Sequence, residues 1–451
     1  MSRLFITEKN FYRNMLVLSL PIVLQNLISN GLAIADNIMV GSLGEVAISS
    51  VTQANQITFV LNLFLFGLGS GSSVLIAQYW GKRDTVNIGH VMGISLLISG
   101  AFSLVFAFGA LVFPESLMSI YTNEPALIEQ GARYLRLVGI SYLPAALSSC
   151  LMINMRSIEK PAVAMCVTFG SFCINVFLNW CLIFGKLGFP ALGVRGAAIA
   201  TTVARFFEMG AIFLYVFRID KVLKVRLQNL FPVPKDLFRD FRHYCTPVIF
   251  NESLWGIGFS VASMIFGRLG ISSVTAYSLA RVLENLMLVF GASTGAACGV
   301  LVGKALGVGD TERAKATART MLVMNSGIGL FFGLITLSIR PLFLSFYNLE
   351  PATYEIANKL IFTMACYMFV KAFTYCMIIG TLRAGGDTRF AMVIDIVFLW
   401  CVSIPLVAFA AFVLHWPVYF VYPLLMVDEV LKSIIALRRF HSDKWMRNVT
   451  R

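Results

Sequence analysis

Apolar runs of about 20 residues recur along the whole chain, and short polar segments separate them. A helix of that length crosses the roughly 30 Å hydrocarbon core of a bilayer at about 1.5 Å per residue. The pattern therefore predicts an all-α polytopic membrane protein with twelve transmembrane helices. The predicted spans are 15–40, 51–77, 89–113, 137–155, 161–185, 196–217, 244–267, 272–302, 320–339, 360–381, 390–414 and 417–437.

The chain repeats itself at a period near 226 residues. "LPIVLQNL" at Leu20 parallels "TPVIFNES" at Thr246, and "IYTNEPA" at Ile120 parallels "FYNLEPA" at Phe346. Each half holds six spans, and an even number inserts both halves in the same direction, so the sequence predicts two six-helix lobes related by a parallel internal repeat. The expected divisions are an N-lobe at 1–217, a cytoplasmic basic linker at 218–243, a C-lobe at 244–437 and a cytoplasmic basic tail at 438–451.

The loops alternate in charge. Lys and Arg gather in every second loop, including 218–242 and 304–319, and in both terminal segments. The positive-inside rule places such segments in the cytoplasm, and an even span count independently puts both termini on one side. We expect a multi-pass protein of the cell membrane, the inner membrane of a bacterium. The net charge of +13 then serves topology and anionic-lipid contact, with no nucleic acid as partner.

A carboxylate inside the first span is the clearest sign of chemistry. Asp36 lies within Met15–Val40, which is otherwise uncharged. Because a charge at the bilayer centre costs about 2.5–3.5 kcal/mol on insertion scales, such a residue usually faces protein or water and often handles protons or ions. Amides at Gln25, Asn26 and Asn30 make this helix a poor lipid-facing surface, and they are candidates for lining a substrate cavity. The alternative is that Asp36 reaches water near the outer interface.

Two later spans carry a second group of polar side chains. Asn175 and Asn179 lie four apart on one helical face, and Ala197 offers a carbonyl one turn before the Thr201 hydroxyl. Together with Asp36 they supply one carboxylate and several neutral oxygens. Such a set suits a hard monovalent cation, or a buried acid whose protonation responds to occupancy. Each asparagine taken alone more often serves helix packing than ligand binding.

The second half offers a further candidate cation or substrate site at Asn251 and Glu252, which the repeat aligns near Gln25 and Asn26, whereas Ala262 aligns with Asp36. Other charged residues within the spans are expected to neutralise one another. The expected pairs are Arg205–Glu208, Arg281–Glu284 and Lys371–Asp395, while Asp428 and Glu429 are expected to be solvated near Lys432.

These residues together resemble the multidrug and toxic compound extrusion (MATE) family of secondary transporters. "LPIVLQNL…ADNIMVGSLG", "GLGSGSSVLIAQYWGKRD", "MRSIEKP", "GVRGAAIAT" and "LRAGGDT" carry the resemblance, which extends over essentially the whole chain. It implies twelve helices in two lobes around a V-shaped cavity, and efflux of organic, often cationic, compounds driven by inward flow of H⁺ or Na⁺. It assigns cation coupling to Asp36, Asn175, Ala197 and Thr201, with Glu252 at a second site in some relatives.

The chain departs from some relatives at one position: where they carry a second acid one turn beyond Asn175, this chain has Asn179. Asp36 is then the only carboxylate of the amino-terminal site, and both H⁺ and Na⁺ stay open as coupling ions. No metal is expected beyond a Na⁺ at Asp36, and no cofactor.

The leading interpretation is an efflux antiporter that works by alternating access as a monomer on small organic molecules within membrane lipid. A lipid-linked saccharide flippase is the alternative, but it would need a strongly basic cavity, and few unpaired cations lie in the spans. Four scattered histidines without an HExxH or Ser-His-Asp grouping argue against an enzyme. Nine cysteines without a CxxC pair are interpreted as apolar packing residues.

Overall fold

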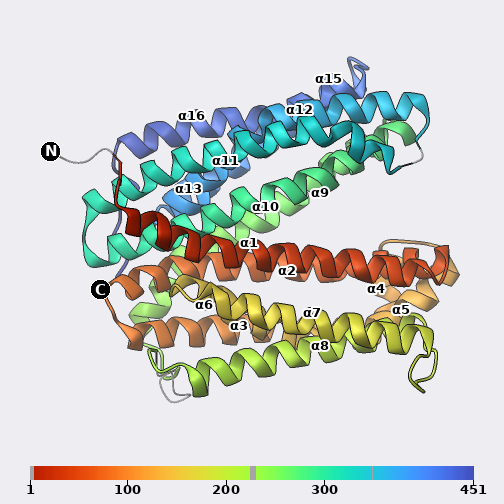
Figure 1. Ribbon diagram of the computed structural model, residues 1–451, viewed down its shortest axis with the longest axis horizontal. Coiled ribbons are helices and arrows are strands. Elements are labelled where there is room, and N and C mark those ends of the chain that lie inside the picture. Colours follow the sequence, from red (N-terminus) through yellow and green to blue (C-terminus); the bar gives the residue numbers. More distant parts are fainter. Residues whose placement is uncertain (1–4, 224–229, 348, 451) are drawn as a thin grey trace. The chain divides into compact units, whose positions relative to one another are not determined.

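The computed structural model describes residues 5–223, 230–347 and 349–450, so residues 224–229 of the expected linker lie outside it. Within these ranges the chain is almost entirely helical and contains no strand. Ten of the described helices are long and apolar enough to cross a membrane (Figure 1). An eleventh crossing results if α5 (Pro125–Gly139) and α6 (Tyr142–Ser157), which meet at 53°, form one bent span. The chain is a multi-pass α-helical membrane protein.

The chain divides into two compact units, and the divisions fall after Val23 and after Cys245. They lie inside α1 (Lys9–Gly41) and α9 (Lys235–Gly267). The reason is apolar packing: the start of α1 contributes Phe11 to a buried cluster with Leu306 and Trp445 of the second half. Trp445, which lies in the basic tail expected at 438–451, is fully buried in this cluster.

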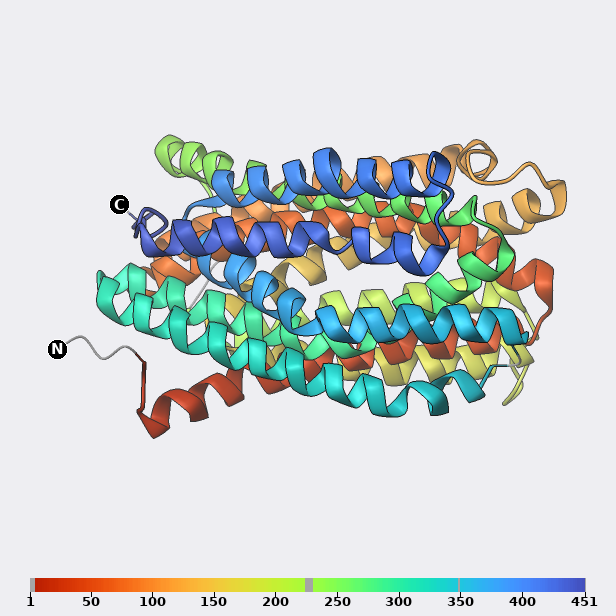
Figure 2. The same ribbon diagram turned by 90° about the horizontal axis from the view of Figure 1, so that it is seen from above.

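The unit of residues 24–245 is built from the end of α1, the seven helices α2 to α8 with a short π-helical extension, and the start of α9. Within it α7 packs along α8, α6 contacts α2, α3 and α8, and α5 lies against α2 (Figures 1 and 2). The elements not yet delimited are α2 (Glu45–Gly81), α3 (Thr85–Val112), α4 (Pro114–Ser119), α7 (Pro161–Phe184), α8 (Val194–Leu214) and η1 (Tyr215–Ile219).

The other unit, called the second unit below, consists of the start of α1 and the part of the chain from residue 246 onward. Its centre is α12, which packs against α10, α11, α15 and α16. The predicted span 417–437 is not one helix, since the chain leaves the helical pattern at Leu425 and Met426, just after Pro423, and two helices result. The elements are α10 (Ile271–Val308), α11 (Thr311–Ser345), α12 (Pro351–Tyr375), η3 (Cys376–Arg383), α13 (Thr388–Phe398), η4 (Leu399–Ser403), α14 (Ile404–Phe412), α15 (Val418–Leu424) and α16 (Val427–His441).

The internal repeat recurs in the details of the helix ends. Asp84 caps the start of α3 by accepting from the Asn87 backbone N–H, and Asp310 caps α11 through Arg313 in the same way. Gly44 and Gly270, which precede α2 and α10, have φ of 110° and 104°, a region that favours glycine. Both pairs lie 226 residues apart. The predicted parallel duplication is therefore present at the level of individual caps.

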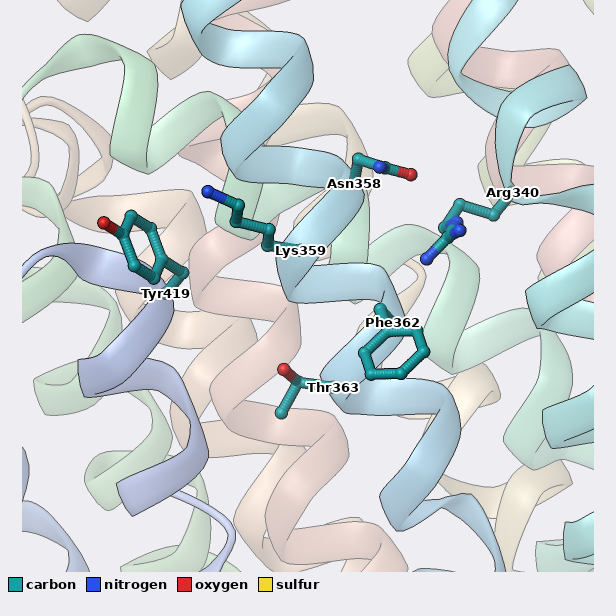
Figure 3. Close-up of a pocket in the computed structure, with 6 residues that line it drawn as sticks. All are labelled: Arg340, Asn358, Lys359, Phe362, Thr363 and Tyr419. Carbon is teal, nitrogen blue, oxygen red and sulfur yellow. The ribbon is translucent and has the colours of Figure 1, made fainter.

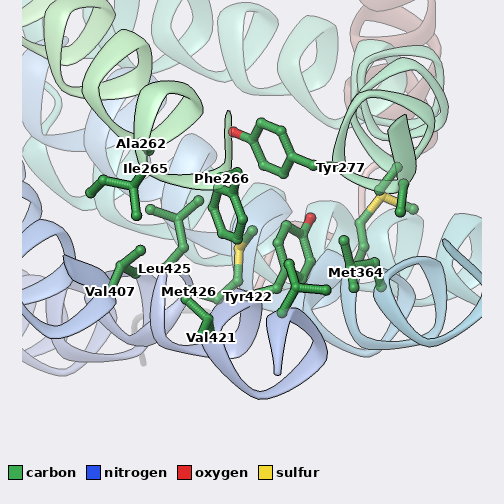
Figure 4. Packing of buried hydrophobic residues seen from close by; sticks show 14 of the residues in the cluster. Ala262, Ile265, Phe266, Tyr277, Met364, Val407, Val421, Tyr422, Leu425 and Met426 are labelled. Atoms are coloured by element: carbon green, nitrogen blue, oxygen red, sulfur yellow. The ribbon is translucent and has the colours of Figure 1, made fainter. Parts of the chain in front are cut away.

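The core of the second unit is an apolar cluster lined by aromatic rings (Figure 4). Phe266 stacks on Tyr277 with ring centroids 4.4 Å apart, and Tyr422 meets both rings edge-on at 6.1 Å. Such offset and edge-to-face pairs add about 0.5–1.5 kcal/mol beyond the area that they bury. Ala262, the repeat counterpart of Asp36, is buried in this cluster. An apolar core therefore occupies the place where the other unit carries its carboxylate.

Candidate functional site

Asp36 lies on α1, half-buried, with its carboxylate turned toward α7. The Asn179 side-chain amide donates a hydrogen bond to Asp36 Oδ1 at 2.5 Å. Asn179 itself is fully buried. The alternative that Asp36 merely reaches water is not what the structure shows, since a neutral amide from another helix binds it inside the unit.

The hydrogen bonds continue from Asp36 across two more side chains. Asn179 Nδ2 also donates to Asn175 Oδ1 at 2.8 Å, and Asn175 Nδ2 donates to Thr201 Oγ1 at 3.3 Å. Asn175 and Asn179 share one face of α7, as their spacing of four predicts. The structure thus brings four of the five sequence-predicted residues into one chain that links α1, α7 and α8.

One acceptor in this chain is unused. Asn179 Oδ1 is buried and has no hydrogen-bond partner, although buried polar atoms are nearly always satisfied. Ala197, the fifth predicted residue, is buried one turn before Thr201 on α8. A carboxylate, an unused amide oxygen and a hydroxyl are hard oxygen donors, so the arrangement can hold a proton on Asp36 or a monovalent cation.

Arg205 is a cation near Asp36 that the sequence did not assign to this site. Arg205 follows Thr201 by one turn on α8 and interacts electrostatically with Asp36. It also forms the predicted ion pair with Glu208, at 2.7 Å. Arg205 is four residues after Thr201, so both side chains lie on one face of α8. This spacing could have indicated from the sequence that Arg205 lies near Asp36.

The three amides of α1 proposed for a substrate cavity differ in their surroundings. Gln25 is buried, accepts from Arg156 Nη2 at 2.6 Å and donates to the Thr168 hydroxyl at 3.0 Å. Its amide is therefore engaged on both sides within the unit. Asn26 and Asn30 are half-buried. A substrate role of these three residues stays a prediction.

In the second unit, Asn251 and Glu252 of α9 contact two different charged groups. Glu252 pairs with Arg383 at 2.7 Å, and both side chains are nearly inaccessible. Asn251 donates to Asp395 Oδ2 at 2.9 Å. The Glu252–Arg383 pair resembles the contact between Gln25 and Arg156, although the repeat aligns Glu252 with Asn26 and not with Gln25.

Two expectations for the charged residues of this unit are wrong. Lys371 pairs with Glu284 rather than with Asp395. Arg281 does not pair with Glu284, and its guanidinium lies over the Phe259 ring, 3.7 Å from the centroid. Because α10 and α12 pack together, a lysine on the neighbouring helix reaches Glu284, and the aromatic face takes the arginine.

The expectation that Asp428 is solvated is also wrong. Asp428 and Lys432 are 3% and 1% exposed, and their side chains lie 2.6 Å apart. Lys432 also contacts Asp395 at 2.7 Å, which is why Asp395 is not available to Lys371. Glu429, with 19% of its side chain exposed, completes this group at 3.7 Å. Ion pairs therefore hold the start of α16 inside the unit, although its sequence suggested a solvated cytoplasmic end.

No group of three or more His, Cys, Asp or Glu side chains within the described ranges is arranged to hold a metal ion. The nine cysteines, all in that part of the chain, are free thiols, and five of them are buried. The oxygens around Asp36 come mostly from amides and a hydroxyl, a set suited to a monovalent cation or a proton more than to a transition metal.

Comparison with known proteins gives one consistent result. A family model described as MatE matches residues 21–181 and 247–409, two segments that begin at the repeat-related prolines. "Probable multidrug resistance protein NorM" of Thermotoga maritima is 25% identical over 448 residues, which cover 96% of this chain and 93% of that protein. "Uncharacterized transporter YisQ" of Bacillus subtilis is 23% identical over 418 residues, with 92% and 90% covered.

The fold has counterparts among solved structures as well. The chain superposes on "Crystal structure of MATE in the bent conformation" with a TM-score of 0.86 and 18% identity, and 96% of each chain is covered. A likeness at this identity establishes a shared fold and leaves the site residues to be argued from this chain.

Proposed function

The chain belongs to the MatE family of membrane transporters and is not an enzyme; from this premise we propose that it exports organic, drug-like compounds, organic cations in particular. Relatives that are named multidrug resistance proteins support this substrate class. Export against a gradient needs an energy source, and we propose inward flow of H⁺ or Na⁺. The protein would work as a monomer in the cell membrane of a bacterium, with both termini in the cytoplasm.

The observation that carries the proposal is the hydrogen-bonded chain from Asp36 through Asn179 and Asn175 to Thr201. Asp36 has a neutral amide as its partner, so its negative charge is only partly offset. Binding of a proton or Na⁺ neutralises that charge and weakens the hydrogen bond that Asn179 donates to Asp36, because the bond is then no longer charge-assisted. A change of this kind between α1 and α7 can favour one conformation over another.

The alternating-access cycle follows from that coupling. In the outward-open state Asp36 takes up the ion, the helices around it repack, and the organic compound leaves. In the inward-open state the ion dissociates to the cytoplasm and a new compound binds. Each half-cycle needs differential binding of the ion to the two states, since a ligand with equal affinity for both shifts nothing.

The charge pairing within the second unit argues against a lipid-linked saccharide flippase. Such a protein needs cations free to meet a pyrophosphate. Arg383, Lys371 and Lys432 instead contact Glu252, Glu284 and Asp428. The pairing leaves little net positive charge for an anionic substrate.

Reconstitution into proteoliposomes tests the proposal. A fluorescent organic cation is supplied outside, and a proton gradient or a sodium gradient is imposed separately with the ion concentrated inside. Accumulation of the dye under one of the two gradients, and its collapse with the matching ionophore, is the expected result. No gradient-dependent accumulation under either condition, with downhill dye movement intact, would contradict secondary active transport.

A further inference from the structure

A pocket of about 260 Å³ lies in the second unit, away from the candidate coupling site (Figure 3). Helices α11, α12 and α15 form it at the end of α11 opposite to the basic segment 304–319. Its lining combines two cations, two aromatic rings and two neutral polar groups. The lining residues are Arg340, Asn358, Lys359, Phe362, Thr363 and Tyr419.

Arg340 is the unexplained group in this pocket. Its Nε is buried and has no hydrogen-bond partner, and no described residue forms an ion pair with it. The guanidinium lies over the Phe362 ring, 5.6 Å from the centroid. Figure 3 shows the Asn358 side chain directed toward the same side of α12 as Arg340. A buried guanidinium N–H without an acceptor is costly, and an anionic oxygen is the partner that it lacks.

Lys359 gives the pocket a second positive charge. Its ammonium lies over the Tyr419 ring, 4.4 Å from the centroid, and also pairs with Glu355 at 2.6 Å. That ion pair is 45% and 68% exposed, so it is screened by solvent and contributes little. Figure 3 shows Lys359 directed toward Tyr419, on the other side of α12 from Arg340, so Lys359 adds positive charge to the pocket without contacting the same group as Arg340.

The surroundings of the pocket indicate where this anion comes from. The same helix ends carry exposed aromatic side chains with a polar group: Trp416 is 44%, Tyr347 40% and Tyr354 38% exposed. Exposed rings of this kind mark the depth of the lipid headgroups in a bilayer. Leu342, 60% exposed, continues an apolar surface along α11 on which acyl chains can lie.

We propose that Arg340 and Asn358 bind the phosphate of an anionic phospholipid at this end of the second unit, and that Lys359 strengthens the binding through its positive charge in the same pocket. Arg340 would donate its unused N–H groups to the phosphate oxygens, a geometry that guanidinium fits in a bidentate way. The site does not depend on the proposed transport cycle, since its binding is measured on the purified protein without any gradient.

The test is lipid binding by native mass spectrometry of the protein in detergent, titrated with phosphatidylglycerol or phosphatidylcholine. The variants are Arg340→Gln and Lys359→Gln, and Arg268→Gln is the matched control because it removes an exposed cation from the loop between α9 and α10, outside the pocket. We expect phosphatidylglycerol to bind more tightly than phosphatidylcholine, and each pocket variant to weaken it about fivefold or more. The control variant should retain native affinity.

Three results would overturn the proposal: equal binding of the two lipids, native phosphatidylglycerol affinity in both pocket variants, or an equal loss in the control. A competition experiment with inorganic phosphate completes the test. Displacement of the lipid by millimolar phosphate would assign the pocket to a soluble anion instead of a headgroup. Lys359→Gln alters an exposed side chain, so it keeps the test informative even if Arg340→Gln fails to fold.

Discussion

Two acids on the repeat-related helices α1 and α9 have opposite kinds of partner, although they lie at different levels of the repeat. Asp36 meets the neutral amide of Asn179, whereas Glu252 meets the guanidinium of Arg383. An acid that already has a full counter-charge gains little from a second cation, while an acid bonded to an amide gains more. This difference favours Asp36 over Glu252 as the residue that exchanges an ion.

Replacing Glu252 tests how much this side chain contributes to the stability of the protein. Glu252→Gln introduces an amide like that of Gln25 in the other unit, but it breaks the ion pair between buried Glu252 and Arg383. We expect a loss of stability of about 3–5 kcal/mol, because breaking a buried ion pair by removing one partner is strongly destabilising. Thermal unfolding in detergent measures it. Glu355→Gln is the control, since its ion pair is exposed and should cost about 1 kcal/mol or less. Equal stability of both variants would show that Arg383 does not need Glu252.

Asp220, just after η1, gives a pH-dependent prediction. Burial would raise the pKa of Asp220, but the Lys160 ammonium at 2.6 Å and two backbone N–H groups outweigh it and lower that pKa. A lowered pKa contributes stability above the unfolded value of about 4, and the contribution disappears as the pH falls through the folded value. Asp220→Asn should therefore destabilise the protein at pH 7 by about 1–2 kcal/mol, with the difference shrinking in acid.

Thermal unfolding at neutral and acid pH checks this difference. Asp443→Asn is the control: its partner is Lys315, its side chain is 44% exposed, and it should show a much smaller effect. A wild-type advantage over Asp220→Asn that grows as the pH falls would have the wrong sign for a lowered pKa.

For single residues, spacing within one helix predicted which side chains share a face. It could not predict partners on other helices. The interval of four between Asn175 and Asn179 predicted their common face correctly. Glu284 was assigned to Arg281 because only its own helix could be considered, whereas its partner Lys371 lies on α12. The alignment of Arg156 with Arg383 in the repeat was the one available sign that both arginines meet polar residues of α1 and α9.

At the scale of helices, hydropathy located the spans, and prolines and close contacts decided their form. The predicted spans 51–77 and 272–302 correspond to α2 and α10, which extend further at both ends. The predicted span 137–155 belongs to a bent pair, and 417–437 is split near Pro423. A hydropathy average cannot report a bend, because the break changes backbone direction and leaves side-chain polarity unchanged.

Helix packing gives a prediction for Gly71 of α2. A Cβ at this position would lie 2.8 Å from the Cys245 Cα, a backbone atom that cannot move aside alone. Gly71→Ala should destabilise the protein by about 1–3 kcal/mol through this overpacking. Gly210→Ala on α8 is the control, since nothing lies within 4 Å of its added Cβ and alanine favours a helix. A Gly71→Ala variant as stable as Gly210→Ala would mean that the two helices are not in contact.

For the whole molecule, the charge of the loops predicts which side faces the cytoplasm. With the nine native cysteines replaced, Phe231→Cys should resist an impermeant thiol reagent added to intact cells and react after lysis. Phe231 is suitable because it is 47% exposed, whereas its neighbour Leu230 is buried. Leu187→Cys, 67% exposed between α7 and α8, should react from outside. The reverse labelling of the two positions would invert the topology.

The sequence predicted the family and the fold correctly, because the motifs and the duplication extend over nearly the whole chain. The division into units could not be predicted, since it depends on which apolar side chains the start of α1 contacts. Phe11 and Met15 join the cluster of Leu306 through side chains some 290 residues further along, and a local pattern does not contain such contacts.

The most direct test of the account concerns Asp36. Asp36→Asn keeps the size of the side chain and its bond to Asn179 while it removes the titratable charge. In proteoliposomes the variant should lose gradient-driven accumulation of an organic cation and still exchange that compound downhill. Asp36→Glu, which retains an acid, should recover part of the accumulation. If Asp36→Asn accumulates the compound at the native rate under the same gradient, Asp36 is structural, and Glu252 becomes the residue to examine for coupling.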